Sequence, residues 1–148
     1  MHKVHVTASF QQSLSQVFNA ITDHRSFLSG GGLTCKIIKP GTTHKNGLGA
    51  IRSVITKKNT FTEEITAFVE NESYDYIITE ITPSMSLKHH NGWLEFKEIK
   101  PNKTQVDWHS HFTITTPIVG HLIGWIAKKQ IEKAFLQRLN YHSKLINQ

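Results

Sequence analysis

The sequence lacks several features that would assign it to a specialised class of protein. Its 148 residues include one cysteine, Cys35, which excludes an internal disulfide and fits a reducing compartment. No apolar run approaches the ~18 residues of a membrane-spanning helix. The most apolar stretch, 117–127, is shorter and contains His121. No hydrophobic signal core follows Lys3. We therefore expect a cytoplasmic protein with no integral membrane association.

Nucleotide-binding and nucleic-acid-binding signals are also missing. The formal net charge is +6, but lysines occur singly or in pairs, with no aromatic residues interleaved in a basic run. The glycine triplet 30–32 lacks the Lys-Ser/Thr that completes a phosphate-binding loop. No serine elbow or Cys–His arrangement can be read from the chain. We expect dispersed, solvated charge, no nucleic-acid partner and no cofactor.

What is present is a series of alternating strand patterns between short turns. Hydrophobic residues make up 38% of the chain, enough for one packed domain covering 1–148. Ser13 and Asp23 are suited to cap two short helices after the first strand. Strands are predicted at 3–10, 35–39, 49–57, 60–70, 73–82, 87–99 and 103–115.

The last segment, 117–146, predicts one long amphipathic helix that begins at Pro117. Its apolar face combines spacings of three and four: Ile123, Ala127, Ile131, Phe135, Leu139, His142 and Ile146. Arg138 falls on the polar back. Gly120 and Gly124 weaken the first two turns, so we expect this end to move.

Strands grouped between helices indicate an α+β fold with a curved antiparallel seven-stranded sheet. One helix must cover a long sheet, and the sheet has to curl around it. Space remains between the two. We therefore predict a ligand cavity whose floor is the helix, with its first turns and the loop at 29–32 at the entrance.

The order of these elements resembles the START/polyketide cyclase-like superfamily (SRPBCC, Bet v 1-like helix-grip), closest to its polyketide cyclase/dehydrase branch. The resemblance covers residues 4 to about 145. The segments that carry it are 17–23, 49–52, 61–65, 74–78 and 104–108.

The resemblance implies a cavity for a small hydrophobic or amphipathic molecule. The side chains expected to face it, spaced by two along each strand, are Arg52, Val54, Glu63, Ile65, Tyr74, Tyr76, Trp108, Ser110 and Phe112, with Ala127, Ile131 and Phe135 from the helix. The resemblance implies this cavity more strongly than it implies a reaction, so the catalytic residues stay unknown, with Glu63 and Arg52 as the best candidates.

Arg52 and Glu63 fall on adjacent predicted strands and should pair if both are buried. Three interpretations stay open for the pair. It anchors the head group of an amphipathic ligand, Glu63 is an acid or base of a catalytic site, or the two form an ordinary cross-strand ion pair.

Three functions follow from these alternatives. The leading hypothesis is binding of a lipid, quinone, polyketide-like or aromatic molecule by a monomer or weak homodimer. The second is a cyclase or dehydratase in which Glu63 is the acid or base and Arg52 stabilises negative charge. The third is a protein-partner or chaperone-like role for the apolar segment 118–125.

Two features that depend on which way the strand at 87–99 faces are left open. Either Trp93, or Leu94 and Phe96, share the face of Trp108, because one residue of register exchanges the two faces of a strand. His109 and His111 share the opposite face, where His89 or His90 could join them. We expect this face to be exposed and to hold no physiological metal.

Overall fold

The computed structural model describes residues 1–146, which form seven strands and three helices. In chain order these are β1 His2–Phe10, α1 Leu14–Thr22, α2 His24–Phe27, β2 Thr34–Lys39, β3 Ile51–Ile55, β4 Thr60–Val69, β5 Ser73–Thr82, β6 Leu87–Lys100, β7 Lys103–Ile114 and α3 Gly120–Ile146. The fold is the α+β helix-grip architecture that the sequence predicts.

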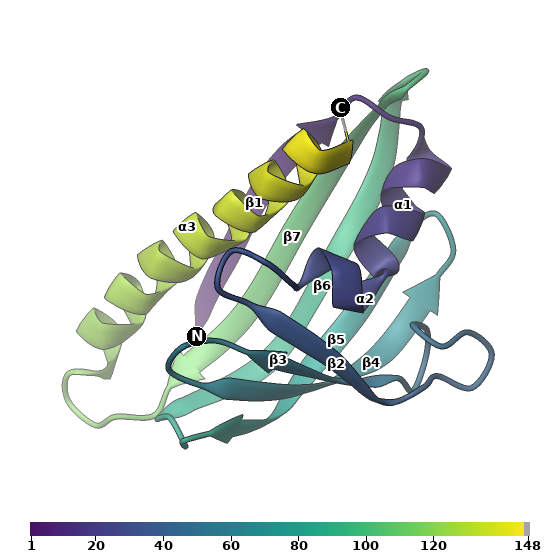
Figure 1. The fold of residues 1–148 in the computed structure, drawn as a ribbon. Coiled ribbons are helices and arrows are strands. Elements are labelled where there is room, and N and C mark those ends of the chain that lie inside the picture. Colours follow the sequence, from purple (N-terminus) through teal and green to yellow (C-terminus); the bar gives the residue numbers. More distant parts are fainter. Residues whose placement is uncertain (147–148) are drawn as a thin grey trace.

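All seven strands form one antiparallel sheet with the order β1-β7-β6-β5-β4-β3-β2. The sheet curves, and all three helices lie over its concave face (Figure 1). α3 runs along β1 and β7, at the edge far from β2. None of the helices described is long and apolar enough to cross a membrane.

The two short helices fill one end of the concave face with a solid core. Ser13 caps α1 through a complete capping box with Gln16, as its spacing predicts. On its buried side, Phe18 packs edge-to-face against Phe68 of β4 and Phe96 of β6. Because this end is closed by side chains, open space is left at the other end, between α3 and the middle strands.

The register of β6 settles one open alternative. Leu94 pairs with Trp108 and is fully buried, and Phe96 is also buried on the inner face. Trp93 lies on the outer face, where its ring stacks on that of His109. A β-bulge between His89 and Asn91 then reverses the alternation near the start of the strand.

The predicted start of the long helix is wrong by three residues. Pro117 lies in the loop before α3, and the helix begins at Gly120. Ile118 has a left-handed backbone (φ 67°), which a helix cannot include. β3 is also shorter than predicted by two residues at each end, because Gly49 (φ 85°) and Ala50 belong to the preceding turn and Thr56 bonds Asn59 in the following one.

Candidate ligand-binding cavity

A cavity of about 590 Å³ lies between the sheet and α3. This volume is within the range of sites that enclose small molecules. One wall is the ring of Trp108 of β7, stacked at 3.8 Å on the ring of Phe135 of α3. Half of the other lining residues are aliphatic or aromatic hydrocarbons or Met: Leu28, Leu33, Val54, Phe61, Ile78, Met85, Leu87, Phe112, Ile131 and Ala134.

Nine of the twelve residues expected at the cavity line it. They are Arg52, Val54, Glu63, Tyr76, Trp108, Ser110, Phe112, Ile131 and Phe135. Their spacing by two along β3, β4, β5 and β7 brings them to the concave face. Whether these side chains contact a ligand stays a prediction.

The other three lie elsewhere. Ile65 is fully buried in the solid core that the short helices form with the sheet. Tyr74 is also fully buried, with its ring against that of His24 of α2 at 5.4 Å, so α2 occupies the space in front of it. Ala127 is half-buried but does not line the cavity, whose lining on α3 begins one turn later at Ile131.

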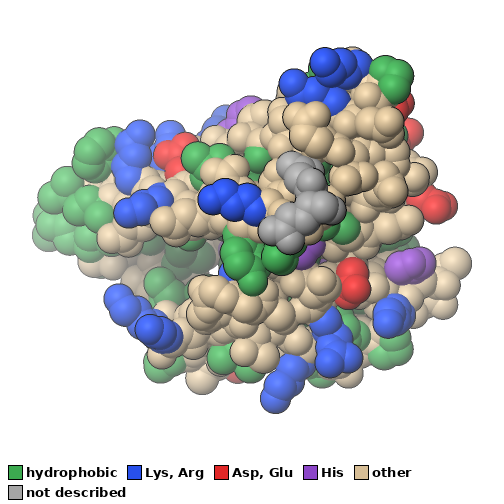
Figure 2. Space-filling view, turned by 45° about the horizontal axis from the view of Figure 1, so that its top comes forward, with side chains coloured by type: hydrophobic (Ala, Val, Ile, Leu, Met, Phe, Trp, Pro, Cys, Tyr) green, Lys and Arg blue, Asp and Glu red, His purple; other side chains and the backbone are tan. Residues whose placement is uncertain are grey.

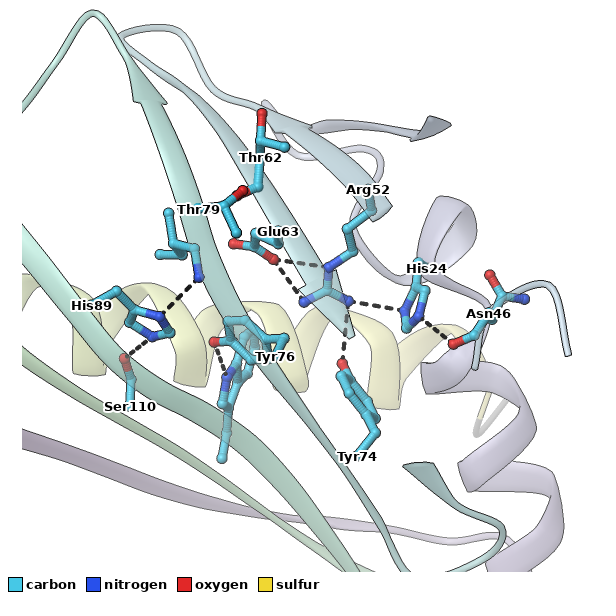
Figure 3. A network of polar contacts seen from close by, with 12 residues as sticks. His24, Asn46, Arg52, Thr62, Glu63, Tyr74, Tyr76, Thr79, His89 and Ser110 are labelled. Carbon is cyan, nitrogen blue, oxygen red and sulfur yellow. Dashed lines mark hydrogen bonds and ion pairs between the residues drawn. The ribbon is translucent and has the colours of Figure 1, made fainter. Parts of the chain in front are cut away.

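Arg52 is the centre of a buried polar network at the inner end of the cavity (Figure 3). It lies directly opposite Glu63 in the β3–β4 pairing. Its Nε and Nη2 atoms each lie 2.8 Å from Oε1 of Glu63. The expected pair is therefore present, and burial is compensated by charge-assisted hydrogen bonds.

His24 completes the coordination of Arg52. Its Nε2 donates to the carbonyl oxygen of Asn46 at 2.9 Å, which leaves Nδ1 as an acceptor for Nη1 of Arg52, also at 2.9 Å. Burial, and then the charge of Arg52, hold the pKa of His24 well below its ordinary value. The imidazole is therefore a neutral acceptor, and it holds Nη1 of the guanidinium while Glu63 holds Nε and Nη2.

Glu63 keeps one carboxylate oxygen for the cavity. Both contacts with Arg52 use Oε1, and the second oxygen points away from Arg52 (Figure 3). Oε2 has no hydrogen-bond partner in the described part of the chain. Burial raises the pKa of Glu63, although Arg52 opposes this shift. The cavity thus contains one strong acceptor with an open position.

His89 and Ser110 form a second polar pair, 3.2 Å apart from Nε2 to Oγ, on the cavity wall. The bulge in β6 places His89 opposite Phe112, on the inner face. Its Nδ1 accepts from the backbone N–H of Ile78 at 3.0 Å, so Nε2 carries the proton and donates to Ser110. Burial lowers the pKa of His89 to about 4.

This tautomer determines what the pair can do. A neutral His89 with its proton on Nε2 cannot accept the hydroxyl proton of Ser110, so the pair does not form an activated nucleophile. The hydroxyl proton of Ser110 is instead free to point into the cavity. Tyr76 is arranged in the same way. Its oxygen accepts from Nε1 of Trp108 at 3.0 Å, and burial raises its pKa, so the phenol remains a donor.

Arg138 is the main correction to the predicted helix faces. The helical pattern places it on the polar back, yet it is buried and lines the cavity. Its guanidinium donates to three backbone carbonyls, that of Phe27 at the end of α2 (3.4 Å) and those of Ser29 (3.0 Å) and Gly30 (2.7 Å) in the loop after it. The loop expected to be a flexible gate is therefore tied to α3, and Gly31 within it also lines the cavity.

The outer histidines do not form a metal site with their neighbours. His109 is stacked between Trp93 at 4.5 Å and His5 at 4.1 Å. His90 bonds Oγ1 of Thr113, whereas His89, the other candidate for this face, faces the cavity. Within residues 1–146, no group of three or more His, Cys, Asp or Glu side chains could hold a metal ion.

Sequence reasoning missed three polar residues of the site. His24 gave no signal, because a lone histidine in a short helix has no period to follow. His89 was missed because the bulge reverses the alternation of β6, and Arg138 because its charge indicated an exposed position. Arg138 follows Phe135 by three residues, so helical spacing allows it a place beside the buried face, but its charge indicated the polar back.

The family comparison agrees with the fold and the cavity. A family model described as polyketide cyclase/dehydrase and lipid transport matches residues 1–141 of the chain. The chain belongs to this family. Its fold and family are consistent with binding of a hydrophobic ligand. No curated protein sequence matches the chain.

Solved structures share the fold of this family member at low identity. A START superfamily protein from Mycobacterium smegmatis has a TM-score of 0.78 and 11% identity over 99% of both chains. A protein from Thermus thermophilus has a TM-score of 0.76 and 12% identity, covering 99% of this chain and 100% of that one. Norcoclaurine synthase from Thalictrum flavum, in complex with dopamine and hydroxybenzaldehyde, has a TM-score of 0.71 and 12% identity, over 98% and 86%.

Proposed function

We propose that this protein binds one small hydrophobic or amphipathic molecule, such as a lipid, quinone, polyketide-like or aromatic compound, in the cavity between the sheet and α3. The observation that carries the proposal is the cavity itself. It combines about 590 Å³ of space with a mostly apolar lining and a few polar groups, the composition typical of small-molecule sites.

The polar groups of the cavity determine which hydrogen-bonding groups a ligand must carry. Glu63 offers an acceptor at Oε2, whereas Tyr76 and Ser110 each keep a hydroxyl proton to donate. A ligand with an apolar body, one hydrogen-bond donor and one acceptor would satisfy all three. A pure hydrocarbon would leave buried polar groups unpaired, at a cost of about 1–3 kcal/mol for each group.

Native mass spectrometry of the protein, purified without detergent, tests the proposal. We expect a mass above that of the chain that disappears on denaturation, and the extracted molecule should carry both polar functions. The same experiment on Ser110→Phe, which fills the cavity wall, should show the bare chain. An unliganded wild type that also gives no thermal shift with a monoacylglycerol, a hydroxynaphthoquinone or a hydroxylated aromatic would contradict the proposal.

A second candidate function is an enzyme of the cyclase or dehydratase type. The observation in its favour is the open oxygen of Glu63 together with its raised pKa, which suits a general acid or base. Norcoclaurine synthase shows that the fold can accommodate an enzyme. Glu63→Gln distinguishes the two functions, because loss of turnover with retained binding of the identified ligand would establish catalysis.

A further inference from the structure

The first turns of α3 and the loop before them leave a group of large apolar side chains exposed. α3 extends past the start of β1 at one end of the molecule (Figure 1). The apolar side chains there are between 39 and 101% exposed: Ile118, Val119, Leu122, Ile123, Trp125 and Ile126. Figure 2 shows hydrophobic side chains gathered at this end, with Lys or Arg side chains beside them. We call these six residues the tip.

The face that carries the tip changes character along the helix. Leu122, Trp125 and Ile126 are followed at the same helical positions by Lys129 and Lys133, because offsets of three, four, seven and eleven residues lie on one face. Lys129 also lies over the ring of Trp125 at 6.0 Å. From Leu122 to Lys129 the helix rises about 10 Å. The face is therefore apolar for two turns and basic directly after them.

The loop before the helix presents its own apolar group. Ile118 has a left-handed backbone (φ 67°) that β-branched residues rarely adopt, and its side chain is fully exposed. Nothing within residues 1–146 covers it. The backbone thus holds an apolar side chain outward, next to the exposed turns of α3.

We propose that the tip docks on the surface of an anionic lipid bilayer. Its apolar residues would enter the boundary between head groups and acyl chains, to the ~5–10 Å depth of interfacial helices. Lys129 and Lys133 then lie at the level of the lipid phosphates, and Trp125 at the interface that tryptophan prefers. Lys128 adds a third positive charge, and Glu132, the one carboxylate among the residues of α3, lies 3.9 Å from Lys129.

Charge favours this partner over a second copy of the chain or another protein. Lysine is depleted from the cores of protein interfaces, whereas here it continues the apolar face without a break. The chain as a whole is also cationic, at +6, so two copies would repel each other and an anionic surface would attract each of them. Docking of the tip does not depend on what the cavity binds.

Vesicle co-sedimentation of the full chain tests the proposal. Vesicles of phosphatidylcholine with about a third phosphatidylglycerol should bind the protein, and binding should fall with added salt. Phosphatidylcholine alone should bind it far more weakly. Two double variants, Leu122→Asp with Trp125→Asp, and Lys129→Glu with Lys133→Glu, should each weaken binding by roughly tenfold or more.

Matched controls come from surfaces away from the tip. Ile38→Asp changes a 60% exposed residue on β2 at the far edge of the sheet, and Lys97→Glu reverses an exposed charge on β6. Both should bind as the wild type does. Three outcomes would overturn the proposal: no binding to the anionic vesicles, unchanged binding of the two double variants, or a dimer in light scattering that the Leu122→Asp variant abolishes.

Discussion

The two halves of α3 both carry large apolar side chains but lie in opposite environments. In the second half, Phe135 stacks on Trp108 and Leu139 is fully buried in the core. In the first half, Leu122 and Trp125 are more than half exposed. The difference arises because the second half lies over the inner face of the sheet, whereas the first half meets the start of β1 at Gly124, against His2, and leaves Leu122 and Trp125 uncovered. Large apolar side chains on one helix are thus buried or exposed according to what lies beneath them.

The sharpest test of this comparison is a pair of identical truncations. Leu139→Ala removes buried side-chain volume and should lower the free energy of unfolding by about 2–5 kcal/mol. Leu122→Ala removes the same atoms from an exposed site and should change it by less than about 0.5 kcal/mol. Urea denaturation measures both. Similar losses in the two variants would mean that the first half is packed in solution.

The pH dependence of the free energy of unfolding tests whether His89, on the cavity wall, is held neutral in the folded protein. Because His89 has a folded pKa of about 4 against about 6.5 when unfolded, the unfolded chain binds more protons between these values. Stability is therefore lost as pH falls from 6.5 towards 4. His89→Gln should remove up to about 3 kcal/mol of that loss. Parallel stability curves for wild type and variant would show that His89 is not held neutral.

Arg138 links the second half of α3 to the glycine loop. Arg138→Met keeps the apolar stem but removes three hydrogen bonds to carbonyls, and should lower stability by about 1–2 kcal/mol. Amide exchange at residues 28–33 should increase. Lys129→Met, on the exposed half, should leave that segment unchanged. Equal exchange in both variants would show that the loop is held by other contacts.

Much of this fold could be predicted because its signals are local. Period-two alternation in β7 assigns Trp108, Ser110 and Phe112 to one face, and the helical period assigns Ile131 and Phe135 to the cavity side. Each of these residues follows its own element's repeat. The sheet, the long helix and most of the lining therefore follow from the sequence.

The rest depends on contacts between elements that are distant in the chain. The bulge that turns His89 inward lies in the pairing of β6 with β7, and the sequence of β6 alone does not predict it. Tyr74 follows the inward alternation, but α2 fills the space in front of it. Arg138 is buried because loop carbonyls more than a hundred residues away satisfy its charge. The cytoplasmic location and the oligomeric state stay predictions.

The central claim is that the space under the second half of α3 binds an apolar ligand and the exposed first half does not. Titration with the fluorescent probe 1-anilinonaphthalene-8-sulfonate tests it in two variants whose fold is checked by circular dichroism. Ile131→Trp fills the cavity, whereas Leu122→Asp makes the tip polar. The account predicts one binding site in the wild type, retained in Leu122→Asp and lost in Ile131→Trp. Loss in Leu122→Asp with retention in Ile131→Trp would contradict it.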